Sequence, residues 1–182
     1  MIERNPDRFL NRTRLKTAFV AVQALVLAGL ALSYYAVGWF GQDVKLRTVP
    51  VDPRDVLYGD YVTLSYDISR LQPSLWRDQT EKAERGKAIY VVLAAGSDGY
   101  AAPAAAYGYK PSAQPGQVVL KGIIRSVWSE GISVEYGLEK YYVPEGTGKD
   151  LEKKASRLAV HLKVAPWGQG KIESLEDREQ GS

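Results

Sequence analysis

Acidic side chains gather in two stretches of this chain and could carry out acid–base chemistry. The first stretch, VDPRDVLYGDYVTLSY, contains Asp52, Asp55 and Asp60, and the second, VEYGLEKYYVPEG, contains Glu139 and Glu145. Two carboxyl groups at a defined separation can suffice for glycoside hydrolysis. One hypothesis is therefore a carboxylate-dependent hydrolase that acts on glycans or peptides. The alternative is that the acids form ion pairs with basic neighbours such as Arg54.

The sequence offers few residues for other kinds of catalysis. It contains one histidine, His161, and no cysteine. This composition excludes thiol nucleophiles, thiolate metal sites and disulfides. Zinc would lack a second histidine, and the acids between residues 52 and 60 lack the dense spacing of a calcium loop. We expect no metal and no cofactor, and we expect His161 on the polar face of the strand LAVHLKV.

Residues 17–40, TAFVAVQALVLAGLALSYYAVGWF, contain no charged side chain. As a helix they would be about 36 Å long, which is enough to cross a hydrocarbon core of about 30 Å. Four aromatic residues near the end of the stretch favour the level of the lipid headgroups; they are Tyr34, Tyr35, Trp39 and Phe40. The stretch predicts a transmembrane helix in the lipid bilayer. A signal peptide cleaved near Ala31-Leu32-Ser33 and a buried core helix remain alternatives.

The excess of positive charge belongs to the N-terminal tail. Residues 1–16 hold five of the 24 basic residues and two of the 21 acidic ones, so the rest of the chain carries 19 of each. A basic flank predicts a cytoplasmic N-terminus in the inner (cytoplasmic) membrane, with the rest of the chain extracytoplasmic. The neutral remainder gives no support for nucleic-acid binding. We therefore expect a cytoplasmic tail (1–16), an anchor (17–40) and an extracytoplasmic β domain (41–182).

Alternating apolar residues and glycine-rich or proline-rich breaks predict strands after the anchor. The predicted strands are 61–68, 88–94, 117–126, 132–136, 141–143, 158–164 and 171–174. Residues 41–53 are expected to form a short polar passage, 70–87 and 96–116 loops, and 150–157 one short helix. Glycines at 129–131 and 167–170 predict hairpin connections. The predicted fold is mainly β, with one transmembrane helix followed by an antiparallel sandwich or small barrel.

The stretch GDYVTLSY has a clear structural interpretation. Gly59 permits a positive φ before the strand, and Asp60 can accept backbone N–H bonds or pair with Arg54. Alternation places Leu64 and Tyr66 on the core face and Tyr61 on the opposite face. The chain has 12 tyrosines, several of them within 58–66 and 136–142. Such grouping favours an aromatic surface that holds a peptide, a glycan or a protein.

The chain resembles the GDYXXLXY protein family, because Gly59, Asp60, Tyr61, Leu64 and Tyr66 fill every fixed position of the motif. The later stretch YGLEKYYVPEGTG is similar to a second signature of that family. The resemblance implies a bacterial, membrane-anchored protein, and it brings no catalytic residues. Similar proteins are often encoded beside multi-spanning membrane proteins, which implies such a protein as the partner.

We therefore predict a binding or accessory module that acts with a membrane protein in the bacterial envelope. The alternative is an envelope hydrolase that uses the acids named above. The candidate functional or partner-contact residues come from both motif stretches; they are Asp52, Arg54, Asp55, Gly59, Asp60, Tyr61, Leu64, Tyr66, Tyr136, Glu139, Tyr141, Pro144, Glu145 and Gly146.

Overall fold

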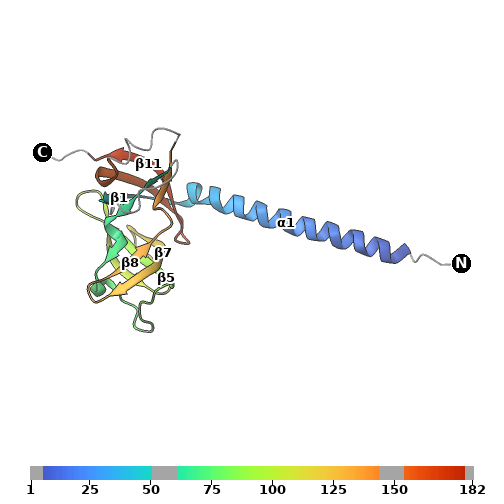
Figure 1. The fold of residues 1–182 in the computed structure, drawn as a ribbon, viewed down its shortest axis with the longest axis horizontal. Helices are drawn as coiled ribbons and strands as arrows, with labels where there is room; N and C mark the ends of the chain where they lie inside the picture. Colours follow the sequence, from blue (N-terminus) through green and yellow to red (C-terminus); the bar gives the residue numbers. More distant parts are fainter. Residues whose placement is uncertain (1–5, 51–60, 144–153, 179–182) are drawn as a thin grey trace.

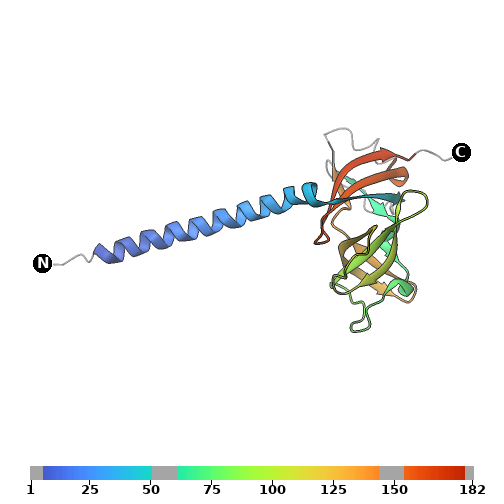
Figure 2. The ribbon, with the colours of Figure 1, turned by 180° about the vertical axis from the view of Figure 1, so that it is seen from behind.

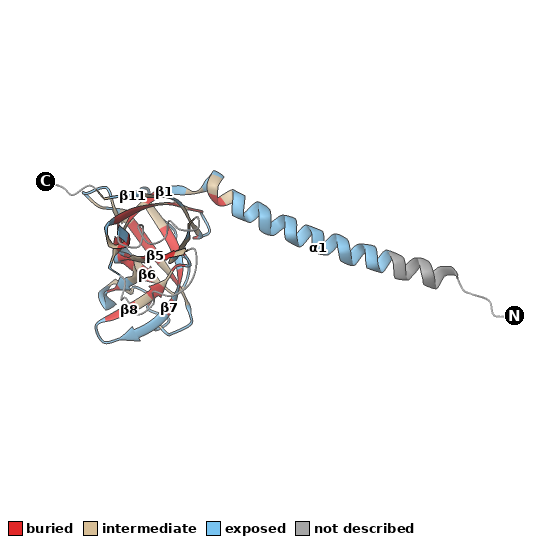
Figure 3. Cartoon of the chain, turned by 45° about the horizontal axis from the view of Figure 1, so that its top comes forward, coloured by how far each residue is buried: buried red, intermediate tan, exposed pale blue. Residues whose placement is uncertain are grey.

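A long helix, α1 (Pro6–Phe40), projects from a β-rich body in the computed structural model (Figure 1). The structure describes residues 6–50, 61–143 and 154–178, and for α1 it describes side chains from residue 14 onward. The segment Arg14–Phe40 is long and apolar enough to cross a membrane. Its described side chains are exposed along most of its length and become buried only next to the β body (Figure 3).

The helix continues into strand β1 (Gln42–Val49) through Gly41 alone. The Gly41 N–H donates to the Val37 carbonyl oxygen at 2.9 Å. A Cβ atom at residue 41 would lie 2.3 Å from that oxygen and 2.9 Å from Cβ of Lys163, so a larger residue does not fit. Val37 is only 1% exposed. The last helical turn is therefore packed against the β body.

The prediction of a polar passage at 41–53 is wrong for residues 42–49, which form β1. Val44, Leu46 and Thr48 point inward, while charged residues such as Lys45 and Arg47 lie between them. The period of two is short in the sequence, because Thr48 is polar and leaves only Val44 and Leu46 as apolar residues on the inner face. Residues 51–53 lie outside the described residues.

In the described residues, three antiparallel sheets make up the body. The first has the order β11-β10-β1-β3 and combines β1 with β3 (Ser65–Tyr66), β10 (Leu158–Val164) and β11 (Gly170–Asp177). The second has two strands, β2 (Tyr61–Thr63) and β9 (Lys140–Tyr142). The third has the order β4-β8-β7-β5-β6, with β4 (Arg70–Leu71), β5 (Ala88–Ala95), β6 (Ala101–Tyr107), β7 (Gln117–Trp128) and β8 (Gly131–Glu135). Short 3₁₀ turns are η2 (Asp67–Ser69), η3 (Pro73–Leu75) and η4 (Ala155–Arg157).

The three sheets enclose one apolar core and include a half-barrel. Figures 1 and 2 show the arrangement of their strands from two opposite sides. Side chains from every sheet reach this core, among them Leu46, Val62, Tyr66, Ile89, Leu120 and Leu162. The predicted fold class, an apolar helix followed by antiparallel β structure, is confirmed. Strands 88–94 and 158–164 and the hairpin connections at 129–131 and 167–170 are also confirmed.

The predicted single strand at 61–68 is wrong, because β2 and β3 belong to different sheets and η2 begins at residue 67. The break lies at Leu64, whose N–H donates to the Glu139 carbonyl at 2.8 Å. Before Leu64 the chain pairs with β9, and after it the chain pairs with β1. The predicted loop 96–116 contains β6, whose alanine-rich sequence AAPAAAY pairs with β5 around a bulge at Ala104. The predicted loop 70–87 contains β4 and η3. Of the predicted helix 150–157, the described end includes η4, and Asp150 lies outside the described residues.

Candidate functional site

The two motif stretches meet where β2 pairs with β9. The register places Tyr61 opposite Tyr142, Val62 opposite Tyr141 and Thr63 opposite Lys140. The described candidate residues from both stretches are thereby brought into one region; they are Tyr61, Leu64, Tyr66, Tyr136, Glu139 and Tyr141. The other candidates lie outside the described residues; they are Asp52, Arg54, Asp55, Gly59, Asp60, Pro144, Glu145 and Gly146.

Two buried tyrosines connect the motif stretches. The Tyr66 hydroxyl donates to the Leu138 carbonyl at 2.5 Å, and the Tyr136 hydroxyl donates to the Ile68 carbonyl at 2.7 Å. Tyr66 of the first stretch thus bonds to the backbone of the second, and Tyr136 of the second bonds to the backbone two residues after the first. Tyr66 is 1% exposed and Tyr136 is 8% exposed. Burial raises the pKa of both phenols, and the charge of Glu139 raises it further, so both remain protonated donors at neutral pH.

A tight turn at residues 136–139 explains the Tyr-Gly-x-Glu part of the second stretch. Gly137 has φ +75°, a conformation that costs little only for glycine. The Glu139 Oε1 atom accepts a hydrogen bond from the Tyr136 N–H at 2.6 Å. Glu139 therefore holds the turn that points the Tyr136 ring into the core.

The opposite face of the β2–β9 ribbon carries an aromatic and cationic surface formed by Tyr61, Lys140 and Tyr142. The rings of Tyr61 and Tyr142 have centroids 5.9 Å apart and are tilted by 59°. The Lys140 Nζ lies 5.0 Å from the Tyr61 ring centroid. Tyr142 is 75% exposed, whereas Val62 on the other face is buried. We call this group the β2–β9 surface.

Sequence reasoning found Tyr61 but missed Lys140 and Tyr142 as members of this surface. Alternation within KYY separates Tyr141 from its two neighbours, and that signal was present in the sequence. The register that sets Tyr142 opposite Tyr61 was not, because it depends on pairing between segments about 80 residues apart.

A second pair of tyrosines lies at the end of β6. The ring centroids of Tyr107 and Tyr109 are 5.4 Å apart, with an interplanar angle of 53°, and Tyr109 is 54% exposed. This pair has nearly the geometry of Tyr61 and Tyr142. It belongs to neither motif stretch and therefore provides a matched internal control.

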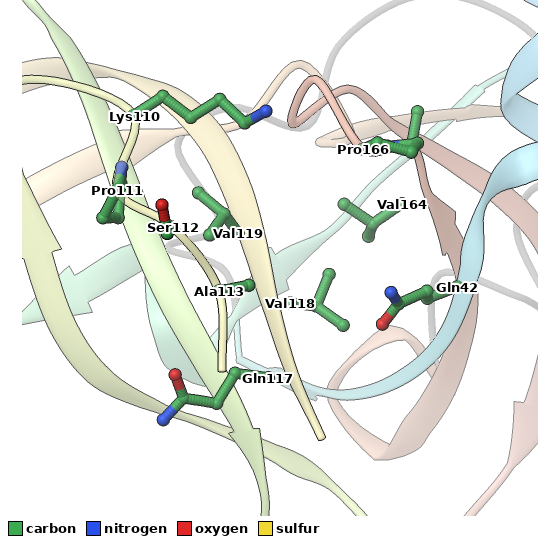
Figure 4. Close-up of a pocket in the computed structure, with 11 residues that line it drawn as sticks. Gln42, Lys110, Pro111, Ser112, Ala113, Gln117, Val118, Val119, Val164 and Pro166 are labelled. Atoms are coloured by element: carbon green, nitrogen blue, oxygen red, sulfur yellow. The ribbon is translucent and has the colours of Figure 1, made fainter. Parts of the chain in front are cut away.

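Two hollows lie on either side of the turn between β10 and β11. One, of about 300 Å³, is lined by residues that include Gln42, Lys110, Gln117 and Pro166, and the Lys110 side chain extends toward Pro166 (Figure 4). The other, of about 620 Å³, is lined by residues that include Lys121, Tyr136 and Trp167. Neither hollow collects the paired acids that a glycosidase requires.

His161 lies on the polar face of β10, as its position in the sequence predicts. Its Nε2 is 2.9 Å from Glu176 Oε2, and Lys45 Nζ is 3.4 Å from the same oxygen. Hydrogen bonds from His161 and Lys45 lower the pKa of the Glu176 carboxyl. Within the described parts of the chain, no group of three or more acidic or histidine side chains is arranged to hold a metal ion.

These observations define the class of protein: a half-barrel β body attached to one long apolar helix, with two tyrosine-rich stretches packed against each other. A family model described as GDYXXLXY protein matches residues 23–175. The chain belongs to the GDYXXLXY protein family. Comparisons with curated proteins and with solved structures found no match.

Proposed function

We propose that this protein is a membrane-anchored, extracytoplasmic binding or accessory module of the bacterial envelope. It acts with a multi-spanning membrane protein that docks on the β2–β9 surface. The observation that carries the proposal is the outward-facing pair of the half-buried Tyr61 and the exposed Tyr142, with Lys140 beside it. Buried tyrosines hold the segments next to this ribbon.

The proposed anchor is α1, with its N-terminus in the cytoplasm. Arg14–Phe40 has 27 residues, about 40 Å of helix, which is enough for the hydrocarbon core and much of the headgroup layers. The last helical turn packs on the β body, and Gly41 joins the two without a linker. This continuity supports a retained anchor, because the helix is one structural unit with the domain.

The β2–β9 surface has the composition of a protein-binding site. Tyrosine is enriched at protein interfaces because it offers a large amphipathic ring with few rotatable bonds. Tyr142 exposes most of its side chain, and Lys140 adds a positive charge beside the rings. The same ribbon places its inner residue, Val62, in the core, so the surface is presented on a rigid support.

Copurification of the full chain in mild detergent tests this proposal. The wild-type protein and the Tyr107→Ala/Tyr109→Ala variant are expected to retain the same multi-spanning membrane protein. The Tyr61→Ala/Tyr142→Ala variant is expected to lose it while remaining folded. Retention of that protein by all three forms, or its absence from all three, would contradict the proposal.

The described residues give no support to the hydrolase alternative at the acids that it names. Of the five acids in that hypothesis, only Glu139 is described, and its Oε1 already accepts the Tyr136 N–H. Its position is explained by the turn that it stabilises. We therefore propose the binding module alone.

A further inference from the structure

The turn between β10 and β11, residues 165–169, lies beside the domain end of α1 (Figures 1 and 2). The Nζ atom of Lys171, directly after this turn, is 4.3 Å from the ring centroid of Tyr34 in α1. The Lys171 side chain thus reaches past the level of Val37 to the ring of Tyr34, toward the part proposed to cross the membrane.

The helix provides a scale of depth for this contact. If Arg14–Phe40 crosses the bilayer, its length of about 40 Å approaches that of the bilayer with both headgroup layers, about 40–45 Å. Tyr34 precedes Phe40 by six residues, or about 9 Å. Since each headgroup layer is about 5–8 Å thick, Tyr34 lies near the boundary between headgroups and hydrocarbon. Lys171, which contacts its ring, lies at headgroup level.

The turn is rigid enough to hold a fixed depth. The Ala165 N–H donates to the Gln169 carbonyl at 2.9 Å, and the Gly168 N–H donates to the Ala165 carbonyl at 2.8 Å. The Lys121 N–H of β7 donates to the Gly168 carbonyl at 2.8 Å. The first two bonds close the turn itself, and the third ties it to the sheet that contains β7.

The side chains of this region suit a phospholipid interface. Trp167 exposes 41% of its surface, and tryptophan favours the membrane–water boundary. Lys171 makes no ion pair with any described residue and can face a lipid phosphate. Lys110 extends toward Pro166 of the same turn and adds a second positive charge (Figure 4).

We propose that the β10–β11 turn rests in the headgroup layer of the outer leaflet, with Lys171 facing phospholipid phosphates and Trp167 at the interface. This inference rests on the proposed function only in taking α1 as the anchor. The occupant is the phospholipid bilayer itself, and the consequence is a domain held at a fixed depth and orientation.

Depth measurements on the full chain test the proposal. The chain contains no cysteine, so single cysteines can carry a spin label in vesicles of phosphatidylethanolamine and phosphatidylglycerol. Gln169→Cys labels the proposed contact, and Glu130→Cys labels the exposed turn between β7 and β8 as a matched control. Leu27→Cys labels the middle of α1. Collisions with lipid-soluble oxygen and with a water-soluble nickel complex report the depth of each label.

The label at position 169 is expected to show a severalfold higher ratio of oxygen to nickel collisions than the label at 130, and Lys171→Glu should reduce that ratio. Equal ratios at 169 and 130, with the label at 27 in the hydrocarbon, would overturn this inference and leave the anchor intact. A label at 169 shielded from both reagents would indicate a protein contact and would also overturn it. A water-exposed label at 27 would instead refute the anchor.

Discussion

Two pairs of tyrosines have opposite environments, although each tyrosine of one pair lies only a few residues in sequence from a tyrosine of the other pair. Tyr66 and Tyr136 are buried and donate to backbone carbonyls across the motif stretches. Tyr61 and Tyr142 lie on the outer face of the β2–β9 ribbon, with their rings in contact. The same two stretches therefore contain buried tyrosines that hold the fold together and outward-facing tyrosines that the fold presents at its surface. Variants of the two pairs should therefore separate stability from binding.

The largest effect is expected from removing a buried ring. Tyr136→Ala or Tyr66→Ala leaves a cavity in the core and should lower the free energy of unfolding by about 3–5 kcal/mol. This loss is a large part of the usual stability of a domain, about 5–15 kcal/mol. Thermal unfolding of the full chain in detergent measures it. Tyr142→Ala is the matched exposed control, and a similar loss there would contradict the assignment of roles.

Removing only the buried hydroxyl should have a smaller effect. Tyr66→Phe leaves the Leu138 carbonyl without this donor, and Tyr136→Phe does the same to the Ile68 carbonyl. Each substitution is expected to lower the free energy of unfolding by about 1–3 kcal/mol, because a buried acceptor loses its partner. Denaturant titration gives the value, and an unchanged midpoint would show that these hydroxyls do not support the fold.

Alkaline pH should act on the same buried pair. The raised pKa of Tyr66 and Tyr136 means that the folded protein keeps two protons which the unfolded chain releases near pH 10. The contribution of the two phenols to the free energy of unfolding is fully present below pH 10. Above pH 10 it falls by about 1.4 kcal/mol per pH unit for each phenol. Unfolding midpoints measured above pH 10 should fall more steeply in the wild type than in Tyr66→Phe/Tyr136→Phe. Equal slopes would contradict the assignment of buried, protonated phenols.

The smallest effect on stability is expected at the outward-facing pair, Tyr61 and Tyr142. Their substitution by alanine loses one ring contact, about 0.5–1.5 kcal/mol, and, at Tyr61, one lysine–ring contact, about 0.5–1 kcal/mol. Tyr107→Ala/Tyr109→Ala should have a similarly small effect. A loss of several kcal/mol at Tyr61 and Tyr142 would assign these rings to the scaffold instead of to a binding surface.

The sequence predicts those features that depend on local pattern. Alternation correctly places Leu64 and Tyr66 in the core, and it locates β10, where apolar residues occupy every second position. It fails for β1, where the inner face ends in the polar Thr48, and for β6, where alanines show no contrast between the two faces.

The candidate region required information that one sequence does not contain. The bond from Tyr66 to Leu138 joins residues 72 positions apart, and it turns two separate tyrosine-rich stretches into one unit. Residue types alone identified both stretches as important. They did not distinguish Tyr136, which is buried, from Tyr142, which is exposed, because that difference depends on the turn at Gly137 and on the register of β9.

Photo-crosslinking in living cells tests the central claim most directly. A photoreactive amino acid replaces Tyr142 in one full-length variant and Tyr109 in another, since both side chains are well exposed and lie next to a second tyrosine. Position 142 is expected to crosslink to one multi-spanning membrane protein, and Tyr61→Ala should abolish this crosslink. No crosslink is expected from position 109. Equal crosslinking from both positions, or none from position 142 in the folded protein, would contradict the central claim.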